Sequence, residues 1–312
     1  MRVVFLGTSD FAASILEHLA KEFLDDIVAI ITKPDKPVGR GQKLQPPPVK
    51  TIAEALFPKI PVLQPERVSS PQAVEALTSL SPDIFIVVAF GEILKPEVLA
   101  IPKVGAFNIH ASLLPAYRGA APIQRALMDG CSHTGITIFR LNPKMDSGDI
   151  VWQKECVIGE NETFGGLSER LLEISKKGVV DLLHTANKLT FSTQSTKGVT
   201  KAPKLLPEDL VLDQSWELQK IHNHIRALSP KPGAYFSVAH QGVKKRLKVV
   251  QAHIDRTLSG GALGWFITDD GALALGNSRG ALIVDTLQLE GRKAMSSKDF
   301  LKGVSLEDLR FF

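Results

Sequence analysis

The sequence predicts an α/β domain with a doubly wound, mostly parallel sheet, followed by a smaller domain built as an antiparallel β-barrel. Short apolar runs alternate with helix-like segments over residues 1–189, which is typical of parallel strands joined by helices. Residues 190–207 are rich in Ser, Thr, Lys and Pro and show little periodicity, which indicates a linker. Residues 208–312 contain short strands interrupted by glycine, as small barrels do.

The individual elements follow from the apolar patterns and from capping residues. Strands of the first domain are predicted at residues 2–6, 27–32, 61–63, 84–89, 105–107, 135–140 and 150–157. Its helices are predicted at residues 10–19, 49–57, 71–80, 122–128 and 163–188. The second domain is predicted to begin with a helix from about 215 to 228, to continue with strands at 234–239, 246–254, 263–268, 272–275 and 282–287, and to end with a helix at 295–302.

The first strand leads into a helix through a turn that contains a single glycine, Gly7. Ser9 or Asp10 can cap the helix that follows. A dinucleotide-binding turn has three glycines, and a carboxylate at Asp10 would repel a pyrophosphate. We therefore expect no nicotinamide cofactor at this turn. Further along, Gly178 is a weak point in the long predicted helix, since glycine lowers helix propensity.

Residues 33–48 form a long, basic segment rich in Pro and Gly, which can be neither a helix nor a central strand. Long loops within compact domains are usually functional or disordered. From composition alone, this segment is either a binding loop or a tolerated surface loop.

The charge is placed unevenly along the 312 residues, whose net charge is +4. Residues 1–196 hold 20 basic and 21 acidic side chains, whereas residues 197–312 hold 17 and 12. The basic excess predicts either a polyanionic partner or an ordinary solvated face. We find no signal-peptide pattern and no apolar run of membrane-spanning length, and Cys131 and Cys156 lack metal-ligand spacing. We expect a cytoplasmic protein with buried thiols, no metal and no membrane partner.

Three polar residues stand out as candidates for chemistry. Asn108 and His110 follow a short apolar run and share one face of a strand end, because alternate strand residues point the same way. Asp146 lies in a loop between two predicted strands. An amide and an imidazole can donate hydrogen bonds to an oxyanion, and an imidazole and a carboxylate can move a proton. Taken singly, each of them could equally be a structural polar residue.

The surrounding motifs are more specific. Asn108-x-His110 is followed by Ser112-Leu-Leu-Pro-x-x-Arg-Gly119, and later by Asp146-x-Gly-Asp149. Together they resemble the family of formyltransferases that use 10-formyltetrahydrofolate, and the resemblance extends over essentially the whole chain. It implies a Rossmann-like catalytic domain and an OB-like barrel. It also implies that Asn108, His110 and Asp146 are the catalytic residues.

The resemblance further implies where the folate co-substrate binds. The matching family segments line the pterin pocket, partly through backbone atoms. In this chain they place seven residues there: Phe90, Gly91, Ile93, Ser112, Leu113, Leu114 and Pro115. Arg118 serves either the site or the structure.

Within the family, the chain is most similar to the members that formylate the methionyl group of initiator tRNA. Those members carry an insertion at the place of residues 33–48 that contacts the acceptor stem, and a basic C-terminal barrel. The resemblance therefore implies six RNA-binding residues: Arg40, Lys43, Lys244, Lys245, Arg246 and Lys248. We expect initiator methionyl-tRNA and folate as partners of a monomer.

Two other functions remain open at this stage. Formyltransferases that act on glycinamide ribonucleotide or on an amino sugar would use the same three polar residues, but they need neither the insertion nor a basic barrel. A non-catalytic RNA-binding protein on the same scaffold would bind tRNA without depending on folate.

Overall fold

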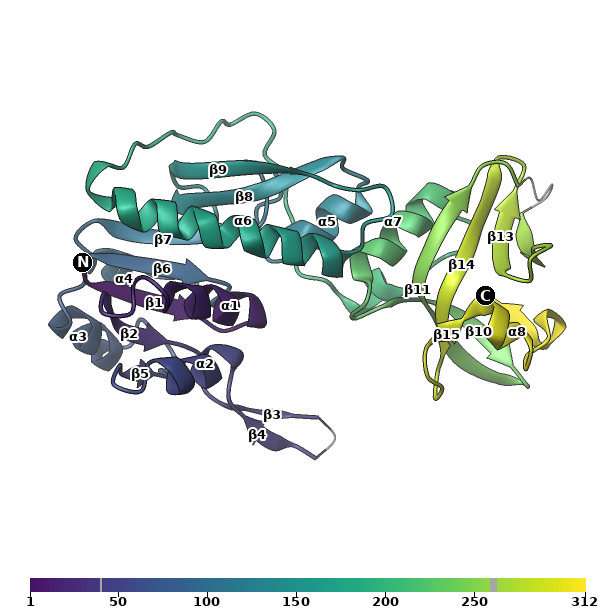
Figure 1. The fold of residues 1–312 in the computed structure, drawn as a ribbon, viewed down its shortest axis with the longest axis horizontal. Helices are drawn as coiled ribbons and strands as arrows, with labels where there is room; N and C mark the ends of the chain where they lie inside the picture. The colour runs from purple at the N-terminus through teal and green to yellow at the C-terminus, as the bar shows by residue number, and fades with distance from the viewer. Residues whose placement is uncertain (40, 259–262) are drawn as a thin grey trace. The chain divides into compact units, whose positions relative to one another are not determined.

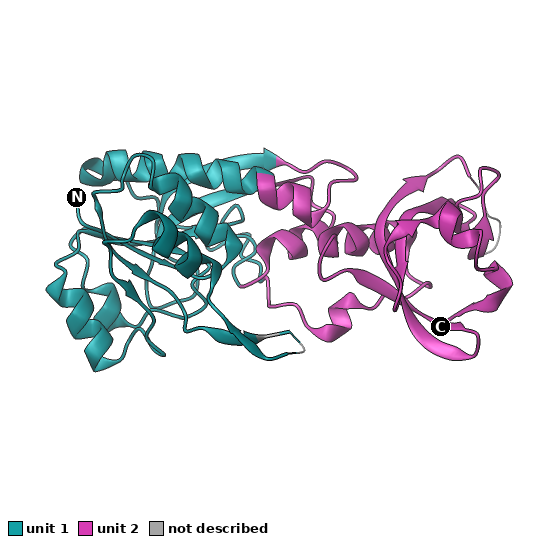
Figure 2. Ribbon diagram, turned by 60° about the horizontal axis from the view of Figure 1, so that its bottom comes forward, with its two compact units in different colours: residues 1–119, 135–156, 170–201 teal, residues 120–134, 157–169, 202–312 magenta. Residues whose placement is uncertain are grey.

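The computed structural model describes residues 1–39, 41–258 and 263–312 (Figure 1). These residues form two compact units (Figure 2). Unit 1 comprises residues 1–119, 135–156 and 170–201, and unit 2 comprises residues 120–134, 157–169 and 202–312. The segment predicted as a linker is therefore divided, with residues up to 201 in unit 1 and the rest in unit 2. Unit 2 also takes in two segments from before residue 189.

Unit 1 is built on a seven-stranded sheet with the order β5-β2-β1-β6-β7-β8-β9. The strands from β5 to β7 are parallel to one another, and β8 is antiparallel to β7. This confirms the doubly wound, mostly parallel sheet. The strands are β1 (Val3–Gly7), β2 (Ile27–Ile31), β5 (Val62–Leu63), β6 (Ile84–Val88), β7 (Gly105–His110), β8 (His133–Arg140) and β9 (Ile150–Val157).

Helices cover both faces of this sheet (Figure 1). They are α1 (Asp10–Leu19), α2 (Pro48–Leu56), α3 (Pro71–Ser79), α4 (Pro96–Leu99) and α6 (Phe164–Thr185). On one face, Leu6 of β1 lies in the same apolar core as Leu77 of α3 and Val98 of α4. On the other face α1 packs so closely that a Cβ at Gly7 would lie 2.7 Å from the Cβ of Ala12. Gly7 thus serves close packing of helix on strand.

The segment 33–48 contains a hairpin that the sequence analysis did not predict. Its strands are β3 (Lys36–Val38) and β4 (Lys43–Gln45), which pair only with each other and lie apart from the main sheet (Figure 1). A proline within a strand is tolerated where the strand is an edge. Both strands of an isolated hairpin are edges, so Pro37 is compatible with β3.

Unit 2 contains an antiparallel sheet with the order β12-β13-β14-β11-β10-β16, and β15 pairs with β14. The sheet curls into a half-barrel, as an OB-like domain does (Figure 1). The strands are β10 (Ala234–His240), β11 (Val243–Asp255), β12 (Gly264–Ile267), β13 (Leu273–Asn277), β14 (Gly280–Leu289), β15 (Met295–Ser296) and β16 (Leu309–Phe311). The helices are α5 (Pro122–Met128), α7 (Leu218–Leu228) and α8 (Ser297–Leu301). The five predicted strands are present, and the two additional ones are short.

No helix among the described residues has the length and apolar character needed to cross a bilayer.

Gly178 was predicted to be a weak point of α6, but the packing of the helix against β9 requires a glycine at this position. A Cβ at this buried position would lie 2.8 Å from the indole ring of Trp152 on β9. The same indole donates a hydrogen bond from Nε1 to Asp181 Oδ2 over 3.1 Å. We therefore expect Gly178→Ala to lower the melting temperature, because the clash outweighs the roughly 1 kcal/mol of helix propensity that alanine contributes.

Gly166 of the same helix provides the matched control. A Cβ there would meet only the Cγ of Glu162, at an ordinary 3.9 Å. Gly166→Ala should leave the melting temperature unchanged or raise it. Equal effects of the two substitutions in thermal unfolding would contradict the packing argument.

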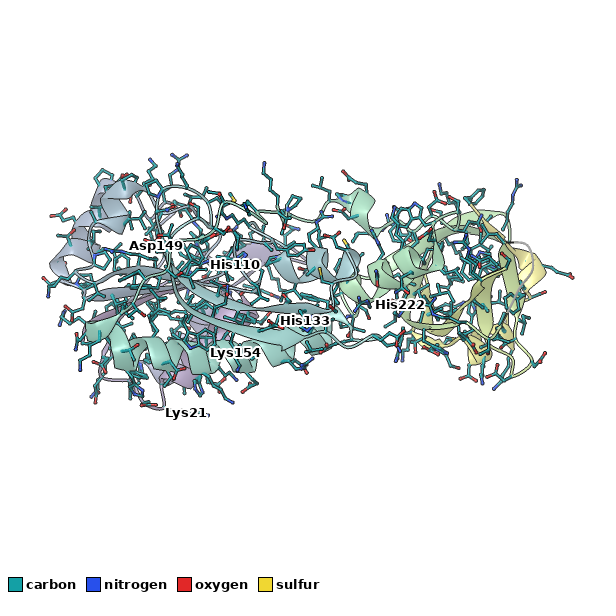
Figure 3. The ribbon with its side chains drawn as sticks, turned by 90° about the horizontal axis from the view of Figure 1, so that it is seen from above. Lys21, His110, His133, Asp149, Lys154 and His222 are labelled. Carbon is teal, nitrogen blue, oxygen red and sulfur yellow. The ribbon has the colours of Figure 1, made fainter. Side chains whose placement is uncertain are left out.

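His222 on α7 is a buried histidine within unit 2 (Figure 3), and its side chain is 1% exposed. Burial, together with the charge of Arg226, lowers the pKa of His222 to about 4. In the unfolded chain the pKa of histidine is about 6.5, so the unfolded state binds more protons between these two values. Stability must therefore fall as the pH drops from about 6.5 toward 4.

The expected slope is roughly 1 kcal/mol for each pH unit in that window. Urea unfolding of the wild type and of His222→Leu at pH 5 and pH 7 measures it, with tryptophan fluorescence as the signal. Wild type should lose more stability than the variant between the two pH values. An identical loss in both proteins would show that another group causes the pH dependence.

Candidate active site

The predicted catalytic residues lie at the carboxyl end of β7, where ligands bind in sheets of this kind. Asn108 pairs with Val87 of β6 and with Phe139 of β8, so β7 is an inner strand at this point. His110 ends the strand, and its side chain is 5% exposed (Figure 3). Asn108 is half-buried and shares a face of β7 with His110.

His110 and Asp146 are brought together across 36 residues of sequence. The distance from His110 Nδ1 to Asp146 Oδ2 is 4.0 Å. His110 Nε2 lies 2.9 Å from the backbone carbonyl oxygen of Tyr117. Because a carbonyl only accepts, Nε2 carries the proton in this arrangement, and in the neutral ring the lone pair of Nδ1 faces Asp146.

Asp146 is itself held by the backbone. Its Oδ2 accepts a hydrogen bond from the N–H of Gly119 over 2.8 Å. Its own backbone has φ +47°, which is the left-handed region. Non-glycine residues rarely occupy this region unless the surrounding structure holds them there.

Burial lowers the pKa of His110 below its ordinary value, whereas the charge of Asp146 and the Tyr117 carbonyl act in the opposite direction. Burial is the largest of these effects, and this was not predicted from the sequence. At neutral pH the imidazole is therefore uncharged, and it can accept a proton rather than only donate one.

The loop that follows His110 is fastened to the antiparallel strands β8 and β9. Thr137 donates a hydrogen bond to the Ser112 carbonyl over 2.6 Å and accepts one from the N–H of Leu114 over 3.1 Å. Gln153 donates to the Leu114 carbonyl over 3.1 Å and to Thr137 Oγ1 over 2.8 Å. Neither Thr137 nor Gln153 was predicted, because single polar residues on alternating strands carry no distinctive pattern.

The seven predicted folate-binding residues differ in how accessible they are. Phe90, Ser112 and Leu114 are almost completely buried, Leu113 and Pro115 are half-buried, and Gly91 and Ile93 are exposed. The Phe90 carbonyl accepts a hydrogen bond from Thr8 Oγ1 over 3.0 Å. The buried three are almost inaccessible as whole residues, backbone included. Their role in folate binding remains a prediction.

Lys33 fixes the segment that contains Phe90 to Ile93. Its ammonium group bonds to the carboxylate of Glu92 and lies 5.0 Å above the ring of Phe90. The other carboxylate oxygen of Glu92 accepts the N–H of Val68 over 3.0 Å. In the sequence analysis Lys33 was only the first residue of a loop, so this supporting role was missed.

A cavity of about 580 Å³ lies between β5 and α3. Its lining includes Ile31, Leu63, Val68 and Leu77, and none of the predicted catalytic or folate-binding residues. The candidate site therefore rests on the positions of its side chains and not on this cavity. Within the described part of the chain, no three His, Cys, Asp or Glu side chains are grouped so as to hold a metal ion.

The predicted RNA-binding residues are divided between the units. Lys43 is exposed on β4 of unit 1, and Arg40 lies outside the described residues. On β11 of unit 2, alternation places Lys244, Arg246 and Lys248 on one face and Lys245 on the other.

All three side chains on this face of β11 have partners in unit 2, and Lys244 Nζ lies 5.7 Å from the centre of the Phe312 ring. The Arg246 guanidinium lies 5.0 Å above the ring of Tyr235, and Lys248 Nζ donates to the Pro232 carbonyl over 3.1 Å. Lys244 and Arg246 are exposed. The strand therefore presents a basic face, and Lys245 is not part of it.

Comparison with known proteins identifies the family. Residues 1–183 match the formyl transferase family, and residues 204–305 match the formyl transferase C-terminal domain. The chain belongs to the formyl transferase family. The resemblance inferred from the three sequence motifs is thereby confirmed.

Curated members of the formyl transferase family align with the chain over its whole length. A methionyl-tRNA formyltransferase of Thermotoga sp. (strain RQ2) is 40% identical over 310 residues, which are 99% of this chain and 97% of that protein. One of Geobacter metallireducens is 40% identical over 309 residues, which are 98% of this chain and 97% of that protein.

Solved structures share the fold of the formyl transferases at lower identity. An N-formyltransferase from Helicobacter canadensis, in complex with folinic acid and dTDP-3-aminofucose, has a TM-score of 0.64 at 19% identity, covering 91% of this chain and 98% of that one. HypX from Aquifex aeolicus, in complex with tetrahydrofolic acid, has a TM-score of 0.63 at 18% identity, covering 97% of this chain and 48% of that one.

Proposed function

We propose that this formyl transferase transfers the formyl group of 10-formyltetrahydrofolate to the amino group of methionyl initiator tRNA, giving N-formylmethionyl-tRNA for the start of translation. The observation that carries the proposal is the 40% identity, over 99% of the chain, to a protein named methionyl-tRNA formyltransferase. The match includes the segments with Asn108, His110 and Asp146.

The geometry supports a proton-transfer role for His110. Formyl transfer forms a carbon–nitrogen bond to the methionyl amine and breaks the bond between the formyl carbon and N10 of the folate. The amine loses a proton, and N10 gains one. Neutral His110, with the lone pair of Nδ1 facing Asp146, accepts the first proton and returns it to N10. Asp146 stabilises the imidazolium in between.

Asn108 serves the other requirement of acyl transfer, which is stabilisation of the oxyanion. Its side-chain amide shares the face of β7 with His110 and is not buried as deeply. An α-amino group has a pKa of about 7.7–8.0, so a sizeable fraction is neutral near pH 7 and no strong base is needed to activate it. The site therefore needs donors and a proton acceptor, but not an activated nucleophile of its own.

A small acceptor is the second candidate, because solved structures of the same fold include sugar N-formyltransferases. Two features favour RNA instead. The hairpin of β3 and β4 carries exposed Lys43, and β11 presents a basic face that a small acceptor does not require. We further propose that the enzyme acts in the cytoplasm as a monomer and uses no metal.

Formyl transfer from labelled 10-formyltetrahydrofolate tests the reaction. Wild type should label charged initiator methionyl-tRNA, and His110→Gln should reduce kcat by about 100-fold or more, since a positioned donor or acid–base group contributes that much. The control is His184→Gln, which removes a half-exposed histidine on α6. If wild type leaves the tRNA unlabelled but transfers the label to an amino sugar, the proposed acceptor is wrong and an amino sugar takes its place.

The basic face of β11 generates a separate prediction. The double substitution Lys244→Ala with Arg246→Ala should raise KM for tRNA about tenfold, leave kcat nearly unchanged, and flatten the salt dependence of binding by about two counterions. Lys298→Ala is the control: it removes one positive charge from unit 2, at a residue paired with Asp270 over 2.7 Å. An equal rise in KM for the control would mean that only net charge matters.

A further inference from the structure

Gln194 lies in the segment that was predicted to be a linker, yet it is one of the buried polar residues of unit 1. Its side chain is 8% exposed. The segment around it is held to the catalytic unit: Ser192 exchanges backbone hydrogen bonds with Ile150, and the N–H of Arg118 donates to the Thr200 carbonyl over 3.0 Å. Linker residues have no such need for burial.

The carboxamide of Gln194 uses its full hydrogen-bonding capacity. Its Nε2 donates to the backbone carbonyls of Asp146 over 3.0 Å and of Gly148 over 2.8 Å. Its Oε1 accepts from Arg118 Nη2 over 2.6 Å and from Arg118 Nε over 3.2 Å. An amide side chain offers two donors and two acceptor sites, and all four are engaged.

These bonds close a ring around Asp146. Gln194 binds the main chain of Asp146 and the side chain of Arg118. The residue after Arg118 is Gly119, whose N–H donates to the Asp146 carboxylate over 2.8 Å. The backbone and the carboxylate of Asp146 are thus both connected to Gln194, one directly and one through the neighbouring loop.

Asp146 needs such support for two reasons. Its backbone has φ +47°, which is unfavourable for a non-glycine residue unless contacts hold it. Its carboxylate is 4.0 Å from His110 Nδ1, so its charge acts on the imidazole, and this interaction weakens as the distance grows. The rest of the loop is packed tightly, since a Cβ at Gly148 would lie 1.7 Å from the Arg140 carbonyl oxygen.

We propose that Gln194 is a positioning residue for formyl transfer: its carboxamide holds the Asp146 loop so that the carboxylate faces His110. The proposal rests on the proposed function, because it assigns Gln194 a purpose in that reaction. A positioning role can be distinguished from a purely structural role, because loss of a positioning residue changes the protonation of His110 in addition to any change in stability.

Two substitutions distinguish the donor group of the Gln194 amide from its acceptor oxygen. Gln194→Glu keeps an oxygen acceptor for Arg118 but removes both donors to the Asp146 loop. Gln194→Met has a similar length and removes donors and acceptor alike. Gln72→Met, at an exposed glutamine of α3, is the matched control.

Both variants should lower kcat by about 10- to 100-fold while KM for folate and tRNA changes by less than about threefold, because misplacing a catalytic group affects the transition state more than binding. The acid limb of the kcat profile should move to lower pH in Gln194→Met, which introduces no charge of its own. The charge of Asp146 raises the pKa of His110, so His110 loses a proton at lower pH when Asp146 is displaced. The control should match wild type in kcat and in the acid limb.

The proposal is overturned if the variants fold and keep kcat within about twofold of wild type, or if kcat of Gln194→Met falls while its acid limb does not move. A lower melting temperature without a change in kcat likewise overturns it. If Gln194→Met does not fold, the Gln194→Glu variant decides, since it retains the bond to Arg118. Failure of the wild type to formylate methionyl-tRNA would reject the proposed function instead. The same variants would then be measured with the acceptor that wild type does use.

Discussion

The candidate site depends on the balance between burial of His110 and the nearby carboxylate of Asp146. Burial lowers the pKa of the imidazole, whereas the charge of the carboxylate raises it. With both present, the pKa of His110 stays below its ordinary value, while a negative charge remains 4.0 Å away to stabilise the protonated ring when it forms. This combination suits a group that must accept a proton and then release it.

The orientation of the ring comes from main-chain atoms. Nε2 donates a hydrogen bond to the carbonyl of Tyr117, seven residues further along the chain. Nδ1 therefore faces Asp146. The Asp146 carboxylate is engaged by the N–H of Gly119. Both contacts come from one loop, and the loop is secured by Thr137 on β8. The antiparallel extension of the sheet thus supports the loop on which the geometry of the pair depends.

Much of the fold could be predicted from the sequence because its signals are periodic. The buried strands of the parallel sheet are continuous apolar runs, and the shared face of Asn108 and His110 follows from the period of a strand. Asp146 was assigned to the same site as this pair only through the resemblance to a family, since no periodicity connects it to β7. Thr137 and Gln194 could not be found in either way. Each is a single polar residue in an ordinary context, and its importance arises from neighbours that the fold brings together.

Short elements were missed for a different reason. The hairpin of β3 and β4 contains a proline, and Lys36, Pro37 and all of β4 are exposed, so neither alternation nor apolar content indicates strands there. β16 has only three residues. Gly178 was interpreted as a weakness of its helix because helix propensity was the only information available. Its close contact with Trp152, which explains the glycine, joins residues 26 positions apart in sequence.

The chemistry and the positive charge of the chain are carried by different regions. Residues 1–196 contain the catalytic candidates and are nearly neutral overall, whereas the basic excess lies in residues 197–312. A phosphate backbone supplies affinity through charge and depends little on sequence, so a basic strand face such as that of β11 is sufficient for it. Alternation along β11 limits that face to Lys244, Arg246 and Lys248, which sets an upper bound of about three phosphate contacts from this strand. Recognition of one particular tRNA therefore requires contributions from outside β11, and exposed Lys43 on the hairpin of unit 1 has a charge and an accessibility that suit that task.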